Sequence, residues 1–395
     1  MKIRPAKRTN SIEEYYFSVK LKEIAGMRAK GIDVINLGIG SPDLSPSTRT
    51  IERLKETSRN PGNHGYQSYT GIPELRNAFA CWYKEYFKVE LNPVNEILPL
   101  MGSKEGIMHI SMAFVNEGDE VLIPNPGYPT YQSVSSLVGA KIRYYNLDEQ
   151  NGWFPDFEAL EQENLEHVKL MWVNYPNMPT GARASKELFQ KLVDFGLKHN
   201  ILICNDNPYS FILNDEQLSF MEIDGAKEIT LELNSLSKSQ NMAGWRIGMV
   251  AGGEEYLREI LKVKSNMDSG MFLPLQLAAV EALGNPPEWY AGLNEIYTKR
   301  REIVFDLLNV LQCTYEKHQT GMFVWARVPV ESGNGEKLSE YILKEANVFL
   351  TPGFIFGSQG DQYIRVSLCT KESLLTETKM RIIDLKKNIN HKVKQ

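Results

Sequence analysis

The sequence predicts an α/β protein with a largely parallel sheet that is covered by helices on both faces. Between about residues 96 and 251, short apolar runs typical of strands alternate with longer segments whose apolar residues recur at helical spacing. Several runs, such as Val168–Val173, are almost wholly apolar, as expected of strands buried on both faces of a parallel sheet. Hydrophobic residues make up 42% and charged residues 24% of the chain, a balance typical of a soluble globular protein.

The predicted elements follow one another in a regular order. A helix at 12–30 and a strand at 32–37 come first, followed by helices at 48–58 and 71–87. The central strands are expected at 96–100, 120–123, 141–145, 168–173, 201–204, 229–233 and 247–251, with helices at 103–115, 128–137 and 185–198. Helices dominate 254–313, and a second alternating region has strands at 323–328, 348–350 and 363–366 and helices at 336–345 and 374–387.

A chain of 395 residues is too long for one ordinary hydrophobic core, so two domains are expected. The second alternating region indicates a smaller α/β domain at the C-terminal end. We predict a large domain at 46–285 and a small domain at 286–395, with the N-terminal segment 1–45 packing on the small domain.

Charge and cysteine usage exclude several classes of protein. The net charge is −5 and no basic block is present, which argues against nucleic acid as a partner. The six histidines show no metal-ligand spacing. No signal peptide or membrane-length apolar run is visible, so we expect no membrane partner and a cytoplasmic location. Scattered cysteines without a paired motif indicate free thiols in a reducing compartment, at Cys81, Cys204, Cys313 and Cys369.

The strongest chemical signal lies in the segment 234–248, which reads Asn-Ser-Leu-Ser-Lys-Ser-Gln-Asn-Met-Ala-Gly-Trp-Arg-Ile-Gly. Lys238 follows a predicted strand and has serine neighbours, and Arg246 comes shortly after it between two glycines. A lysine in this setting can form an imine with an aldehyde, while the hydroxyls and the guanidinium bind a phosphate. The alternative is an ordinary solvated lysine, which is the more common case for a single lysine.

Further candidates come directly after other predicted strands. Because parallel sheets bind ligands outside the carboxyl ends of their strands, these residues are expected to share one site. Asp206 can pair with a protonated pyridine nitrogen, or it can simply form a turn or cap a helix. Tyr209, three residues later, can reach the same ring. Ser103 and Lys104 stand where a strand becomes a helix, so the backbone there can bind a phosphate or be capped.

Arg365 lies inside the apolar strand predicted at 363–366. A buried arginine is unusual unless it is paired, and its planar guanidinium suits the two oxygens of a carboxylate. The alternative is an internal salt bridge with an acidic residue of the same chain.

With these residues placed, the sequence resembles the class I/II aminotransferases of the pyridoxal-phosphate fold-type I superfamily over nearly its whole length. The most specific match is Ser-Leu-Ser-Lys238 followed by Gly-Trp-Arg246-Ile-Gly, which is similar to the family's Schiff-base signature. The resemblance implies pyridoxal 5′-phosphate as cofactor, a large domain on a mostly parallel seven-stranded sheet flanked by helices, and a smaller α/β domain. It also implies amino-group transfer between an L-amino acid and a 2-oxo acid by a ping-pong mechanism.

The resemblance assigns a role to each candidate residue. Lys238 is expected to be the imine lysine and proton-transfer base, Asp206 to pair with the pyridine nitrogen, and Tyr209 to contact the ring oxygen. Arg365 is expected to hold the substrate α-carboxylate under the loop that contains Gly40. The remaining cofactor contacts implied are the phosphate ligands Ser103, Lys104, Ser235 and Arg246, the ring-stacking Tyr128, and Tyr66 from a neighbouring subunit. This last match implies a homodimer with shared active sites.

The run Pro176-Asn177-Met178-Pro179-Thr180-Gly181 departs from the family's usual Asn-Asn-Pro-Thr-Gly. Met178 occupies the place of the second asparagine, which in the family donates a hydrogen bond to the ring oxygen. A thioether cannot donate a hydrogen bond. Either Asn177 is re-aimed towards the ring, or Tyr209 makes this contact alone.

The segment 264–272 carries no arginine where aspartate-specific members of the family often place one. It is more similar to the subgroup that includes diaminopimelate and some alanine or methionine aminotransferases. Met267, Met271 and Phe272 suit an apolar pocket, or else ordinary helix packing. The amino donor and the oxo-acid acceptor stay open.

The motifs leave two other functions to be weighed. A carbon–sulfur lyase or another β/γ-lyase on the same fold would share Lys238, Asp206 and Arg365. Release of pyruvate and ammonia from cystathionine without an oxo-acid acceptor would identify it. A regulatory module that binds the cofactor without turnover is disfavoured, because no DNA-binding domain is attached and the catalytic set is nearly complete.

Overall fold

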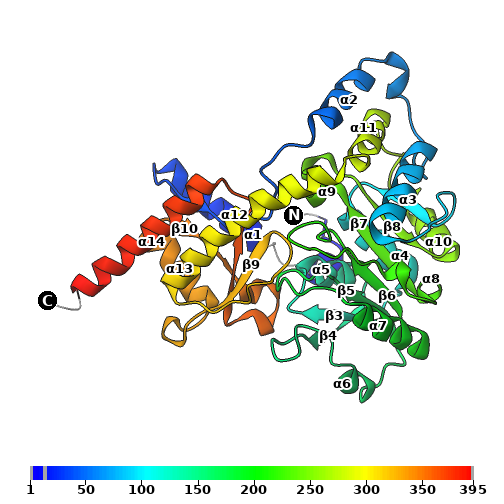
Figure 1. The fold of residues 1–395 in the computed structure, drawn as a ribbon. Helices are drawn as coiled ribbons and strands as arrows, with labels where there is room; N and C mark the ends of the chain where they lie inside the picture. The colour runs from blue at the N-terminus through cyan, green and yellow to red at the C-terminus, as the bar shows by residue number, and fades with distance from the viewer. Residues whose placement is uncertain (1–2, 12–15, 393–395) are drawn as a thin grey trace.

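The larger lobe of the protein is built on one seven-stranded sheet, and the smaller lobe lies at one side of it (Figure 1). The computed structural model describes residues 3–11 and 16–392. In spatial order the strands are β2 (Ile97–Leu100), β8 (Gly248–Gly252), β7 (Thr230–Ser235), β6 (Leu202–Asp206), β5 (Val168–Val173), β3 (Glu120–Asn125) and β4 (Lys141–Asn146). Within this sheet β8 runs antiparallel to both neighbours and the other pairs are parallel, which confirms the mostly parallel sheet.

Helices bury both faces of this sheet. Alternate side chains of β5 are buried on opposite faces of the sheet. Leu170 and Trp172 pack into one apolar cluster, and Met171 and Val173 pack into another. The longer helices of this lobe are α2 (Thr48–Ser58), α3 (Pro73–Phe87), α4 (Ser103–Phe114), α5 (Pro129–Leu137), α7 (Lys186–His199), α10 (Glu254–Lys264) and α11 (Leu273–Leu283). The shorter ones are α6 (Phe157–Glu161), α8 (Ala226–Ile229) and α9 (Leu236–Ser239).

Helix α7 illustrates why these segments fold as predicted. Ser185 caps its first turn, since the serine side chain accepts a hydrogen bond from the Leu188 N–H. Leu188 and Leu192, one turn apart, are buried against the sheet. Asn200 ends the helix in the left-handed conformation, which asparagine tolerates better than most residues.

The smaller lobe has its own sheet and helices. Its antiparallel sheet has the order β11 (Thr351–Pro352), β12 (Tyr363–Ser367), β9 (Phe323–Arg327), and β1 (Ile35–Asn36) pairs in parallel with β10 (Val348–Phe349). The helices are α1 (Tyr16–Ala29), α12 (Pro287–Leu311), α13 (Gly335–Ala346) and α14 (Glu372–Lys392). Short 3-10 turns lie at η1 (Lys7–Ser11), η2 (Pro61–His64), η3 (Phe220–Glu222), η4 (Ala243–Trp245), η5 (Val330–Ser332), η6 (Gly353–Phe356) and η7 (Ser358–Gly360).

Two predicted elements differ from the observed ones. The strand expected at 32–37 shrinks to the two residues of β1, and the strand expected at 348–350 divides into β10 and β11. Residues 12–15 of the first predicted helix lie outside the described part of the chain. The domain boundaries at 45 and 285 stay a prediction. It is supported by α12, whose Tyr290 packs with the large-lobe core while residues from Leu293 onwards pack with the small-lobe core.

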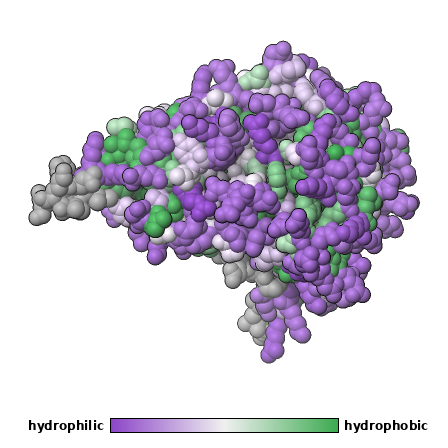
Figure 2. All heavy atoms as spheres, turned by 60° about the horizontal axis from the view of Figure 1, so that its bottom comes forward, coloured by the Kyte–Doolittle hydropathy of each residue, from purple (hydrophilic) through white to green (hydrophobic). Residues whose placement is uncertain are grey.

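The face of the molecule that Figure 2 shows is mainly hydrophilic, with apolar side chains in scattered groups. Among the described helices, none combines the length and the apolar composition needed to cross a membrane.

A buried carboxylate ties together the strands that carry the site. Glu232 on β7 accepts hydrogen bonds from the Tyr83 hydroxyl at 2.9 Å, the Ser219 hydroxyl at 2.7 Å and the Phe220 N–H at 3.0 Å. Asn205 on β6 donates to it at 3.3 Å. Burial raises the pKa of Glu232, and these four donors partly offset that effect.

Replacing Glu232 by alanine is expected to destabilise the protein by at least about 3 kcal/mol, because several buried donors lose their acceptor together. The midpoint of thermal or urea unfolding measures the effect. Glu295→Ala removes an exposed ion pair with Lys299 and serves as the control, with an expected change below about 0.5 kcal/mol. Equal shifts for the two variants would show that the Glu232 network does not hold these strands.

Candidate active site

The carboxyl ends of the strands open into a cavity of about 520 Å³ that also contacts the smaller lobe. Ten of the predicted site residues line it: Gly40, Ser103, Lys104, Tyr128, Asp206, Tyr209, Ser235, Lys238, Arg246 and Arg365. Tyr66 does not, and its side chain is 93% exposed away from the cavity of its own chain. Gly40 and Arg365, more than 300 positions apart in the sequence, therefore line the same cavity as the residues that follow the central strands.

Lys238 lies in the short helix α9, directly after β7. Its Nζ atom donates a hydrogen bond of 2.6 Å to the carbonyl oxygen of Gly40. Burial lowers the pKa of Lys238, and the smaller effects of its charged neighbours are mixed, because Cys369 and Asp206 raise the pKa while Arg365 and Arg246 lower it. A larger fraction of this amine is therefore neutral, and hence nucleophilic and basic, than for a solvated lysine.

Asp206 is the last residue of β6 and is buried. Its Oδ2 atom accepts a hydrogen bond of 3.1 Å from the Tyr131 hydroxyl, and the Tyr131 ring stacks on Trp172 at 5.1 Å. Its Oδ1 atom has no hydrogen-bond partner among the described residues. Burial raises the pKa of Asp206 to about 6. A buried carboxylate oxygen without a partner is suited to a donor that carries positive charge.

Positive charge gathers at the start of α4. Gly102, in the left-handed region at φ 88°, forms the turn before Ser103 and Lys104. The first backbone N–H groups of a helix have no acceptor within the helix, and those of α4 lie at this turn. A side chain at Gly102 would place its Cβ 2.2 Å from the Arg246 guanidinium, so this arginine lies directly on the turn. Burial, and then Arg246, lower the pKa of Lys104. This arrangement suits a phosphate group.

The hydroxyls before Lys238 lie beside the same turn. Ser235 Oγ donates to Ser237 Oγ at 2.9 Å and accepts from the Ser237 N–H at 3.1 Å, and both serines line the cavity. Tyr128 lines the cavity too, with its ring edge-on to Tyr131 at 5.6 Å.

Arg365 lies on β12 and is buried. Its guanidinium lies 3.8 Å from the centre of the Phe323 ring and 4.6 Å from that of Phe356. The Nη2 atom donates to the Gly38 carbonyl at 2.9 Å, and Nη1 contacts the Met178 sulfur at 3.2 Å. The Gly38 carbonyl and the Met178 thioether orient the guanidinium, whose planar fork suits the two oxygens of a carboxylate.

The loop with Gly38 and Gly40 packs against Phe323, and an ion pair of Asp43 anchors the residues that follow it. A Cβ atom at Gly40 would lie 2.1 Å from the Phe323 ring, so no larger residue fits the observed path. Further along, Asp43 pairs with the buried Arg300 of α12 at 2.6 and 3.0 Å. Arg300 also contacts Glu372 at the start of α14.

The orientation of Asn177 bears on the alternatives for the run 176–181, namely that Asn177 turns towards the ring or that Tyr209 makes the contact alone. Asn177 is turned into its own loop, where its amide donates to the Asn174 carbonyl at 3.1 Å and accepts from Thr180 Oγ1 at 2.7 Å. It does not line the cavity, whereas Met178 and Tyr209 do. The re-aiming of Asn177 is therefore not seen, and the contact of Tyr209 with the ring oxygen stays a prediction.

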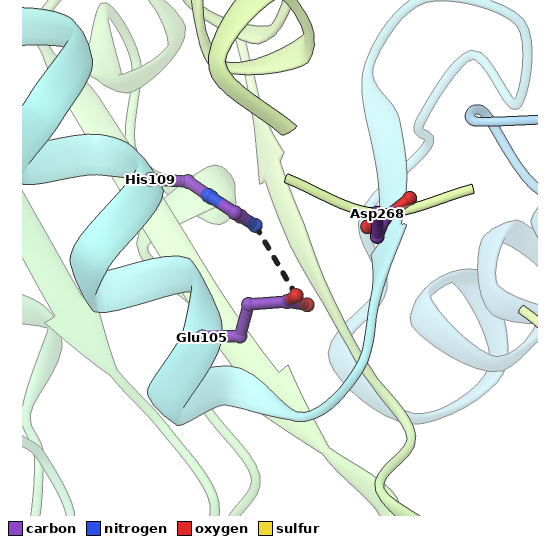
Figure 3. Close-up of side chains that lie close together, drawn as sticks. All are labelled: Glu105, His109 and Asp268. Carbon is purple, nitrogen blue, oxygen red and sulfur yellow. Dashed lines mark ion pairs between the residues drawn. The ribbon is translucent and has the colours of Figure 1, made fainter. Parts of the chain in front are cut away.

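A buried polar cluster lies behind the turn of α4 (Figure 3). His109 Nε2 is 3.4 Å from Glu105 Oε1, and Asp268 faces both residues. The Lys264 ammonium lies 2.8 Å from Asp268 Oδ2 and supplies the positive charge that a metal ion would otherwise bring. Lys264 also donates to the Tyr69 carbonyl at 2.9 Å. The cluster joins α4 to the segment after α10.

Several lining residues were absent from the predicted set of site residues, among them Tyr131 and Ser237. Tyr131 follows Tyr128 by one helical turn, so the helix predicted at 128–137 already placed both rings on one face. Ser237 directly precedes Lys238 in the sequence, and its place between Ser235 and Lys238 is the signal that could have identified it. The pairing of Tyr131 with Asp206 spans 75 positions, and no local pattern indicates it.

Comparison with known proteins agrees with this geometry. Residues 32–379 match the family described as aminotransferase class I and II. An LL-diaminopimelate aminotransferase of Dehalococcoides mccartyi is 39% identical over 383 residues, covering 96% of this chain and 98% of the relative. Another, of Desulforudis audaxviator, is 41% identical over 379 residues, covering 95% and 96%. The apo structure of BacF from Bacillus subtilis has 37% identity and a TM-score of 0.93, with 98% of each chain covered. These similarities do not favour the lyase alternative.

The raised pKa of Asp206 predicts a pH-dependent cost in the protein freed of cofactor. The folded state holds the proton more tightly than the unfolded state, so the free energy of unfolding falls as the pH rises from about 4 to above 6. Asp206→Asn removes this cost. The variant is expected to match the wild type near pH 4 and to exceed it by about 3 kcal/mol near pH 7.5. Urea unfolding at both pH values measures this, and a difference independent of pH would contradict it.

Proposed function

The chain belongs to the class I and II aminotransferase family, and on that premise we propose which residues perform its reaction and how two copies share it. It transfers an amino group between an amino acid and a 2-oxo acid, with pyridoxal phosphate as cofactor. The observation that carries the proposal is the convergence of Lys238, Asp206 and Arg365 on one cavity.

The residues of the cavity fit the cofactor at three points. Pyridoxal phosphate, when bound, supplies an aldehyde and a ring that withdraws electrons from the substrate. The partnerless Oδ1 of Asp206 suits the protonated ring nitrogen. The amine of Lys238 suits the aldehyde. We assign the phosphate to the positive turn of α4, with the ligands Ser103, Lys104, Ser235 and Arg246.

Asp206 keeps its charge in the complex because a cation then stands beside it. Tyr131 holds Oδ2, so Oδ1 stays directed into the cavity. An ionised Asp206 keeps the ring nitrogen protonated and so favours the loss of a proton from the substrate Cα. Tyr128 is assigned to the face of the ring, and the Tyr209 hydroxyl to the ring oxygen in place of an amide.

Arg365 and Lys238 act on the substrate. We assign the α-carboxylate to Arg365, whose aromatic surroundings strengthen the interaction by excluding water. Lys238 is the base that takes the Cα proton and returns it at the neighbouring carbon. The Gly40 carbonyl holds the Lys238 amine at the cavity wall whenever that amine is free.

Two copies are proposed to share their active sites. The proposal is supported by an exposed group of aromatic and apolar side chains beside the Lys264–Asp268 pair. Its members are Tyr66, Tyr69, Met267 and Phe272. We assign Tyr66 to the phosphate of the other subunit. The free thiols of the described cysteines are consistent with a cytoplasmic location, which we also propose.

Asp206→Ala is predicted to lower turnover by at least about 100-fold, because the ring nitrogen loses the charge that keeps it protonated. The rate of 2-oxo acid formation from a good amino donor measures the loss. Asp224→Ala, at an acidic residue outside the cavity, is the matched control and should keep wild-type turnover. Wild-type turnover in the Asp206 variant would refute the assignment.

Mixing two impaired variants tests the shared site. Lys238→Ala lacks the base of its own site, and Tyr66→Ala lacks the residue proposed for its partner's site. A mixed dimer contains one site with both residues intact. After the variants are unfolded and refolded together, activity should rise to about one quarter of the wild-type value. Activity no higher than the sum of the separately refolded variants would show that Tyr66 does not act across subunits.

A further inference from the structure

The charged groups of the cavity are all needed for the cofactor and for the invariant part of an amino acid. Among the described lining residues the cations are Lys104, Lys238, Arg246 and Arg365, and the carboxylate is Asp206. The proposed function gives each of them a task at the phosphate, the ring, the aldehyde or the α-carboxylate. No charged side chain of the described lining is left over for the substrate side chain.

An apolar wall lies where the cavity opens to the surface. Phe17 and Leu21 stand one turn apart on α1, and Ile39 projects from the loop that precedes Gly40. Leu21 and Ile39 are 40% and 37% exposed. The Phe17 ring lies 5.7 Å from the Arg365 guanidinium, so the wall begins beside the place assigned to the α-carboxylate. Exposed apolar side chains grouped at a cavity mouth indicate a surface that a ligand covers.

The segment that carries Tyr66, and the segment 264–272 beside it, offer little charge to a partner subunit. The segments 64–70 and 264–272 contain two charged residues apart from His64, namely Lys264 and Asp268. Both are buried, and they pair with each other at 2.8 Å. The side chains that these segments expose include Tyr66, Met267 and Phe272. Apart from His64, the side chains that these segments expose are therefore uncharged, and they include aromatic and apolar ones.

We propose that the amino donor of this enzyme is an L-amino acid with an apolar or aromatic side chain, which Phe17, Leu21 and Ile39 cover at the cavity mouth. The inference rests on the proposed function, since it takes Arg365 as the α-carboxylate site. LL-diaminopimelate, named for the relatives above, ends in a second carboxylate and a second amino group. The described wall offers neither charge a partner, and burying an unpaired charge there is costly.

Unreactive carboxylates test the wall without the reaction. Calorimetric binding of 3-phenylpropanoate and of glutarate to the holoenzyme compares an aromatic end with a second carboxylate at similar length. We expect 3-phenylpropanoate to bind at least about tenfold more tightly. Leu21→Arg should reverse or abolish this preference. Val19→Arg places the same charge on α1 outside the cavity lining and should leave the preference unchanged. Equal affinities in the wild type, or no effect of Leu21→Arg, would overturn the proposal.

A panel of amino donors completes the test. In single turnovers of the holoenzyme, 2-oxo acid should form from L-phenylalanine, L-leucine and L-methionine at least about tenfold faster than from L-aspartate, L-glutamate or LL-diaminopimelate. Faster reaction of a charged donor would overturn the inference and leave the roles of Lys238 and Asp206 intact. Failure of every donor, with the binding preference present, would instead overturn those roles.

Discussion

The active site depends on one buried carboxylate whose second oxygen lacks a partner. Placing Asp206 at the end of a central strand removes it from water, and this raises its pKa and costs folding free energy. Tyr131 satisfies one oxygen, and Asn174 donates to the Asp206 backbone carbonyl, which anchors the end of β6. The other oxygen has no hydrogen-bond partner among the described residues, and we propose that a cationic ring nitrogen supplies one.

The rest of the fold keeps this carboxylate and the amine of Lys238 in register. They come from the neighbouring strands β6 and β7, whose separation is set by ladder hydrogen bonds and by the Glu232 network with Asn205. Arg365, on β12 of the smaller lobe, lines the same cavity. The Gly38–Gly40 loop connects the two halves, because Arg365 donates to the carbonyl of Gly38 and Lys238 to that of Gly40. Movement of this loop would disturb both cations together.

Local sequence patterns predicted which strand ends carry the site residues, and they did not predict the contacts that orient some of those side chains. Lys238, Asp206 and Ser103 were found because each directly follows an apolar strand, and parallel strands align those ends. The turn of Asn177 into its own loop was not predictable, because it depends on Thr180 and Asn174 folding around the amide. The acceptors of Arg365 were equally hidden, since Gly38 and Met178 lie 327 and 187 positions away. Contacts of this kind are set by tertiary packing and have no periodic signature.

Met178 shows how one unusual residue can serve the same site differently. Its sulfur accepts from Arg365 and cannot donate a hydrogen bond, and for this reason we propose that Tyr209 makes the contact with the ring oxygen. The surrounding rings of Phe323 and Phe356 complete an apolar setting for the guanidinium.

The central claim is that Lys238 binds the cofactor in this cavity and exchanges it with an incoming amino acid. The most direct measurement is the absorbance spectrum of the purified protein from about 300 to 500 nm, before and after addition of amino acids. We predict a visible band that is missing in Lys238→Ala and that an amino donor shifts to shorter wavelength in the wild type. A wild-type protein without such a band, even after pyridoxal phosphate is supplied, would contradict the account.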